Sequence, residues 1–160
     1  MKQLYRKGAL GALMEEYERA ASELQRVLEE ISEAEFVRIV DEQTRDENCR
    51  SVQTIMAHVV SAGYGYAAYM RSAFAMNPER PAKRLLALRE SREELQAMLD
   101  YTIATLEGRW EMTNEGIRSA VMHTNWGVTY DLEQMLSHAI VHVLRHRLQI
   151  EKFIALMRRD

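Results

Sequence analysis

Apolar residues recur every three or four positions along most of this chain, which is the spacing of one face of an α-helix. No segment shows sustained alternation of apolar and polar residues, so the pattern favours an all-α fold. It predicts four long helices, covering approximately Gln3 to Ile31, Ser51 to Ala75, Pro81 to Gly108, and Asp131 to Met157.

Local signals support several of these boundaries. Ser51 suits the N-cap of the second helix, and Asp131 with Gln134 three residues later has the spacing of a capping box. The Asn77-Pro78 pair should end the second helix, because the residue before a proline avoids helical geometry. Pro81 suits the first turn of a third helix that Gly108 ends.

Two polar stretches, Ser32 to Arg50 and Arg109 to Tyr130, are predicted to be long connections. The first contains four apolar residues that we expect to pack part of it against the helices: Phe36, Val37, Ile39 and Val40. A chain of 160 residues is long enough to bury a core of its own. The expected architecture is therefore a four-helix bundle with two long connections, formed by one domain over residues 1–160.

Composition narrows the possible partners and location. The formal net charge of −3 and the pI of about 6.0 give no basic surface for nucleic acid. No apolar run approaches the roughly 20 residues needed to span a membrane, and we identify no secretory signal. Cys49 is the only cysteine, so no intrachain disulfide can form. These features predict a cytoplasmic protein, and long amphipathic helices favour a homodimer.

The candidate chemistry lies in histidines placed in apolar, helix-like segments. His138, His142 and His146 are each four residues apart, so neighbouring members lie about one helical turn apart and can share an ion. His58 lies in the second predicted helix. If the two helices pack together, three imidazoles can converge in the bundle.

A helical wheel ranks these histidines by their direction. At about 100° per residue, His146 points toward the apolar face of the last helix, His142 lies at its margin, and His138 lies further toward the rim. His58 takes a border position on its own helix. The best-placed pair is therefore His142 with His146, and His138 remains a possible substitute or additional ligand.

Three imidazoles without an acidic ligand can hold zinc and leave its fourth position open. Nickel, copper and iron also accept imidazole, so the residue types alone do not select the metal. The absence of a Glu-x-x-His pair argues against a di-iron centre, which needs bridging carboxylates. His123 falls in a predicted loop and is expected to be an ordinary polar residue.

The segment from His142 to Ile150, HVLRHRLQI, resembles the His-xxx-His-Arg-Gly-Gln-Ile signature of the DinB/YfiT-like metalloenzyme family. The segment Ser51 to Val59, SVQTIMAHV, looks like the second-helix motif of that family, which supplies its first histidine. The resemblance implies a DinB-like bundle with a divalent metal, zinc or nickel, on His58, His142 and His146. The chain departs from the signature at Leu148, where the family prefers glycine and where leucine could narrow the site.

Members of that family include thiol-dependent transferases and isomerases. The resemblance therefore implies a metal-dependent S-transferase or isomerase that acts on a small molecule, with a low-molecular-weight thiol as a partner. A metal with an open fourth position, held by three histidines, also allows a hydrolase. No general base or nucleophile can be identified, so the catalytic residues stay open. A non-catalytic metal-binding or ligand-binding stress-response bundle is the alternative. A metal-free interaction module is a third reading.

Several residues near the histidines have two possible roles. Gln149 is placed to bond a histidine or a substrate, and Arg147 to pair with an acid on another helix. Tyr66 and Tyr69 either line a pocket with His58 or belong to the core. Trp126 either forms a pocket mouth or packs its loop. Cys49 is expected to be inert.

Overall fold

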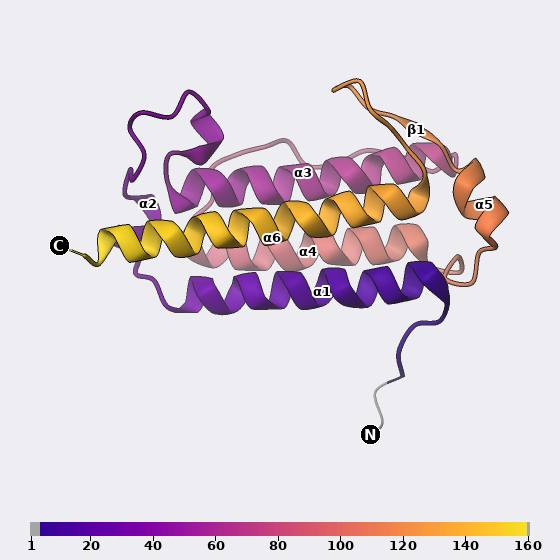
Figure 1. Ribbon diagram of the computed structural model, residues 1–160, viewed down its shortest axis with the longest axis horizontal. Coiled ribbons are helices and arrows are strands. Elements are labelled where there is room, and N and C mark those ends of the chain that lie inside the picture. Colours follow the sequence, from indigo (N-terminus) through magenta and orange to yellow (C-terminus); the bar gives the residue numbers. More distant parts are fainter. Residues whose placement is uncertain (1–3, 160) are drawn as a thin grey trace.

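The computed structural model describes residues 4–159 and contains four long helices packed side by side (Figure 1). They are α1 (Gly8–Glu29), α3 (Val52–Ala73), α4 (Leu88–Leu106) and α6 (Leu132–Met157). The all-α prediction is confirmed. The shorter elements are α2 (Glu33–Val37), the 3₁₀ helix η1 (Glu47–Cys49), α5 (Asn114–Ser119), and a two-stranded antiparallel hairpin of β1 (Met122–His123) and β2 (Thr129–Tyr130).

The two helices that matter most for the site begin where the sequence predicts. The Ser51 side chain accepts a hydrogen bond from the Thr54 backbone N–H, and the Asp131 side chain accepts one from that of Gln134. Both pairs form complete capping boxes, which satisfy backbone donors that a helix start leaves without partners.

The first helix begins later than predicted, at Gly8. The predicted start, Gln3, lies outside the described residues. Gly8 has a φ of 75°, a left-handed conformation from which a right-handed helix cannot extend backward. A Cβ at this position would also lie 2.2 Å from the Trp110 carbonyl oxygen. The glycine thus allows the chain to turn closely past the loop that contains Trp110.

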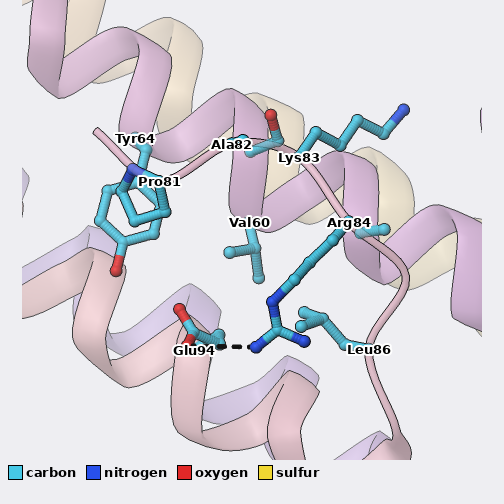
Figure 2. Close-up of a pocket in the computed structure, with 10 residues that line it drawn as sticks. Val60, Tyr64, Pro81, Ala82, Lys83, Arg84, Leu86 and Glu94 are labelled. Atoms are coloured by element: carbon cyan, nitrogen blue, oxygen red, sulfur yellow. Dashed lines mark ion pairs between the residues drawn. The ribbon is translucent and has the colours of Figure 1, made fainter. Parts of the chain in front are cut away.

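The third helix begins at Leu88, so the prediction of a helix start at Pro81 is wrong. The segment 74–87 instead runs back along α3, and its bonds show the direction. Arg80 Nη1 donates to the Ser61 carbonyl oxygen, whereas the Leu86 carbonyl oxygen accepts from Gln53 Nε2. Figure 2 shows Ala82 and Arg84 of this segment beside Val60 and Tyr64 of α3. These tertiary bonds replace the helical bonds that the sequence pattern favoured.

This return segment sets the topology. Because it ends beside the start of α3, α3 and α4 run in the same direction, opposite to α1 and α6 (Figure 1). The closest helix pairs are α1 with α6 and α3 with α4, and α3 also packs on α6. That third contact brings the two histidine-bearing helices together.

The core lies between the inner faces of the long helices, and Phe36 from α2 joins it with no exposed surface. Val40 also packs against the core, but Val37 and Ile39 are about half exposed, so only part of the predicted contact forms. On the outer face of α6, Val141, Leu144 and Leu148 are exposed. A single chain does not test the predicted homodimer, which stays a prediction.

The connection from α4 to α6 holds α5 and the hairpin at one end of the bundle (Figure 1). Gly127 turns the hairpin with a φ of 83°. The Tyr69 hydroxyl on α3 accepts a hydrogen bond from the Asn125 backbone N–H, which ties the hairpin tip to the bundle. Within residues 4–159, no helix combines the length and apolar character required to span a membrane.

Candidate metal centre

Three histidines from two helices meet at the contact between α3 and α6. One ring nitrogen from each of His58, His142 and His146 lies within 4.8 Å of the other two. The closest approach joins His58 Nε2 to His142 Nε2 at 3.0 Å. The ring centroids of His142 and His146 are 4.5 Å apart, as expected for residues one turn apart on a helix.

The convergence agrees with the sequence-based hypothesis, and the marginal positions predicted for His142 and His58 agree with their partial burial, but the predicted depth of His146 does not. The helical wheel predicted that His146 points into the core, whereas in the structure His58, His142 and His146 are all only partly buried. The core proper is filled by apolar neighbours of these residues, including Ala139, Val143 and Ile150 on α6. The histidines therefore line the edge of the α3–α6 contact, where a small molecule can reach them.

The surroundings keep these imidazoles neutral. Burial lowers the pKa of His58, His142 and His146 below that of a free histidine. For His142 the pKa falls to about 3, because burial acts together with the nearby His146 and His58. A neutral imidazole keeps one nitrogen lone pair, which is the form that binds a metal.

A side-chain amide selects the tautomer of His146. Its Nδ1 lies 3.0 Å from Gln149 Oε1, an oxygen that can only accept a hydrogen bond. The proton must therefore be on Nδ1, which leaves the lone pair on Nε2. Holding a ligand ring through its other nitrogen is typical of metal sites. The expected bond between Gln149 and a histidine is confirmed.

The arrangement fits a divalent cation. Three neutral rings bring nitrogen lone pairs into a space of a few ångströms, where they repel one another. A shared proton removes this repulsion only between His58 and His142. A metal ion in this space would replace that proton and use all three lone pairs. The donor set, three imidazoles without a carboxylate, is one that zinc or nickel accepts.

One pocket, with a volume of about 450 Å³, opens directly over the three histidines. Its other walls are Asp46, Cys49, Arg145 and Gln149. Cys49 Sγ lies 3.8 Å from Gln149 Oε1, so the structure places this cysteine beside the site, which sequence reasoning did not foresee. Burial raises the pKa of its thiol, which keeps the sulfur protonated and agrees with the prediction that it is inert.

A second pocket, here called the aromatic pocket, has a volume of about 390 Å³ and shares the His58 wall with the three-histidine cluster. Its lining residues include Tyr66, Tyr69, Trp126, His138 and Arg80. The two tyrosines and Trp126 thus line a pocket, as the sequence allowed, and Tyr66 also belongs to the buried core. The role of Arg80 could not be foreseen, because it depends on the extended path of residues 74–87.

His138 does not belong to the cluster. Its ring stacks on Trp126 with centroids 5.9 Å apart, and its Nδ1 lies 3.3 Å from the Tyr130 hydroxyl. His123 is exposed on the hairpin, where its Nδ1 contacts the Thr129 hydroxyl. The structure thus separates the convergent histidines from the other two.

Two further expectations about α6 have different outcomes. Arg147 forms an ion pair with Glu23 of α1, as predicted for a cation facing another helix. Leu148 is half exposed and lines neither pocket beside the histidines. The expectation that this leucine narrows the site is therefore wrong, because its position on the helix directs the side chain outward.

The depressed pKa values predict acid sensitivity of the metal-free protein. An unfolded histidine gains a proton below pH 6.5, but folded His142 does so only at about pH 3. Between these values the unfolded state binds more protons, so stability falls as the pH falls, by about 1 kcal/mol per pH unit from this residue. Urea unfolding in EDTA should show the slope, and His142→Asn should reduce it. Equal slopes for both proteins would contradict the prediction.

A comparison with known proteins places the chain in a family. The family model of the DinB family matches residues 2–158, nearly the whole chain. No curated protein matches the chain.

Proposed function

We propose that this chain, which belongs to the DinB family, binds one divalent metal ion through His58, His142 and His146 and uses it to act on a small molecule. One observation carries the proposal: ring nitrogens of three histidines, contributed by two helices, lie within 4.8 Å of one another. Zinc or nickel is the proposed metal, because neutral imidazoles suit both ions.

The reaction class we propose is a thiol-dependent S-transfer or isomerisation, or a hydrolysis. When bound, the ion supplies Lewis acidity at a position open to the pocket. Gln149 holds the His146 ring in its ligating tautomer. Arg145 places a cation at the rim of the same pocket, where it would attract an anionic substrate or a thiolate.

A non-catalytic metal-binding protein is the second candidate, and the protonation states near the site favour it. Burial keeps the Cys49 thiol protonated and raises the pKa of Tyr66 to about 12. Neither group is therefore a ready base or nucleophile at neutral pH. A low-molecular-weight thiol such as 2-mercaptoethanol separates the candidates: a change in the spectrum of the cobalt-substituted protein supports the enzyme, and an unchanged spectrum supports the binding protein.

Metal analysis tests the proposal directly. The protein purified without added metal, or titrated with zinc or nickel after treatment with a chelator, is expected to bind about one ion per chain. Mass spectrometry under native conditions and elemental analysis measure this ratio. A protein that takes up neither ion would refute the proposed function, whichever reaction is considered.

A further inference from the structure

The aromatic pocket has the composition of a binding site for a flat, negatively charged molecule. Tyr66, Tyr69 and Trp126 surround it with rings, and Trp126 lies edge-on to both tyrosines at centroid distances of 6.2 and 5.7 Å. The volume of about 390 Å³ falls in the range of small-molecule sites. Such walls bind aromatic or other flat apolar groups by contact with their faces and edges.

The fixed charge in this pocket is a single cation. Arg80 lines it, and no aspartate or glutamate is among the lining residues. Burial lowers the pKa of His138 and raises that of Tyr66 to about 12, so both side chains are neutral at physiological pH. An anion that enters the pocket meets Arg80 without repulsion from another lining side chain.

Arg80 has donors to spare. Its Nη1 donates to the Ser61 carbonyl oxygen at 2.9 Å, and it forms no ion pair with any residue in the described part of the chain. A guanidinium has five N–H groups in a planar fork that matches a carboxylate. The backbone bond holds the side chain in place while the remaining donors stay available.

A glycine on α3 makes room for this guanidinium. A Cβ built on Gly65 would lie 3.0 Å from Arg80 Nη1, closer than ordinary van der Waals contact. Gly65 itself lines the pocket. The helix thus lacks a side chain at a position where a Cβ would crowd the Arg80 guanidinium.

We propose that the aromatic pocket binds small molecules that combine a flat apolar body with a carboxylate, and that Arg80 recognises the carboxylate. The bound body lies against Trp126 and the tyrosines and reaches the His58 wall shared with the three-histidine cluster. The assignment of such molecules as substrates rests on the proposed function. Their binding does not, because no metal ligand is needed to hold them.

The test uses 3-phenylpropionate as a probe and 3-phenylpropanamide as its neutral counterpart. The acid is expected to bind with a dissociation constant of about 1 mM or tighter, and the amide about ten-fold more weakly. Tryptophan fluorescence reports binding, and shifts in the amide NMR signals of Gly65 and Asn125 locate it. No binding of the acid up to about 10 mM, or equal binding of acid and amide, would overturn the proposal.

Two arginines on the same segment provide a matched pair of variants. Arg80→Gln should weaken binding of the acid about ten-fold and leave the amide unchanged. Arg84→Gln removes the same charge four residues away. Figure 2 shows that Arg84 is directed instead toward Glu94 on α4, to which it forms an ion pair at 3.8 Å. This control should bind the acid like the wild type, and equal losses in both variants would refute a specific role for Arg80.

Gly65→Ala offers a second test that does not remove the charge. Alanine favours the helix, so the fold is retained, but the new methyl group requires the guanidinium to shift by a few tenths of an ångström. Several-fold weaker binding of the acid, with thermal stability equal to or above that of the wild type, is the expected result. Unchanged affinity would contradict the proposed position of Arg80 in the complex.

Titrations of zinc-loaded and EDTA-treated protein distinguish this inference from the proposed function. Probe binding by a protein that takes up no metal would support the pocket and refute the metal centre. Metal uptake without probe binding would do the reverse.

Discussion

Replacing His142 with alanine is expected to raise the dissociation constant for zinc or nickel at least about 100-fold. Loss of a residue that merely supports a metal ligand already costs 10–100-fold in affinity, so loss of a ligand should cost more. His142 is the member of the cluster that lies closest to both partners, with ring centroids 4.8 Å from His58 and 4.5 Å from His146. Titration with a competing chelator measures the change.

His123→Ala is the matched control for this experiment. The substitution is chemically the same, but His123 is exposed on the hairpin and lies outside the convergent group. The control should retain one ion per chain with unchanged affinity. If both variants bind metal like the wild type, His142 is not a ligand. If both lose it, the loss does not arise from the cluster, and circular dichroism would show whether the fold has changed.

The sequence predicted the part of the fold that depends on local signals. The capping residues Ser51 and Asp131 and the apolar periodicity located α3 and α6 to within about two residues. Because those helices carry His58, His142 and His146, the candidate site could be proposed before its geometry was known. The spacing of four residues placed two rings on adjacent turns, and the packing of α3 on α6 supplied the third.

The extended segment 74–87 could not be predicted in the same way. Apolar residues there, such as Leu85 and Leu86, fit a helix as well as a strand, and Pro81 fits the first turn of a helix. The extended path is stabilised by bonds to distant residues, including Gln53 and Tyr101, whose hydroxyl donates to the Glu79 carbonyl oxygen. Tertiary contacts therefore override local preference. The position of Arg80 depends on the path of this segment, so it could not be predicted either.

The depth of His146 was also beyond a wheel calculation. A wheel treats the apolar centre of one helix as the core, but α6 packs on both α1 and α3, and the rings lie toward α3. The position of Cys49 beside Gln149 likewise depends on how the connection before α3 folds. Such placements depend on how neighbouring elements pack, and the sequence pattern of a single helix does not specify that packing.

Phe36→Ala is expected to lower the free energy of unfolding by about 4 kcal/mol, because a fully buried ring is lost and a cavity remains. The residue is the anchor by which α2 packs on the bundle, since it is the buried member of that helix. Urea denaturation should show a midpoint lower by about 2 M with an unchanged slope. A loss below about 1 kcal/mol would mean that α2 does not contribute its side chain to the core.

Val37→Ala, at the next position of the same helix, is the control. Its side chain is 50% exposed, so stability should change by less than about 1 kcal/mol. The two variants also test how the site is held in place. The connection anchored by Phe36 continues into Asp46 and Cys49, which line the pocket over the three histidines. If the anchor holds that wall in place, Phe36→Ala should make the Cys49 thiol react faster with a thiol reagent, whereas Val37→Ala should leave the rate unchanged. Equal rates in the two variants would show that the wall is held by its own contacts, including the bond between Cys49 and Gln149.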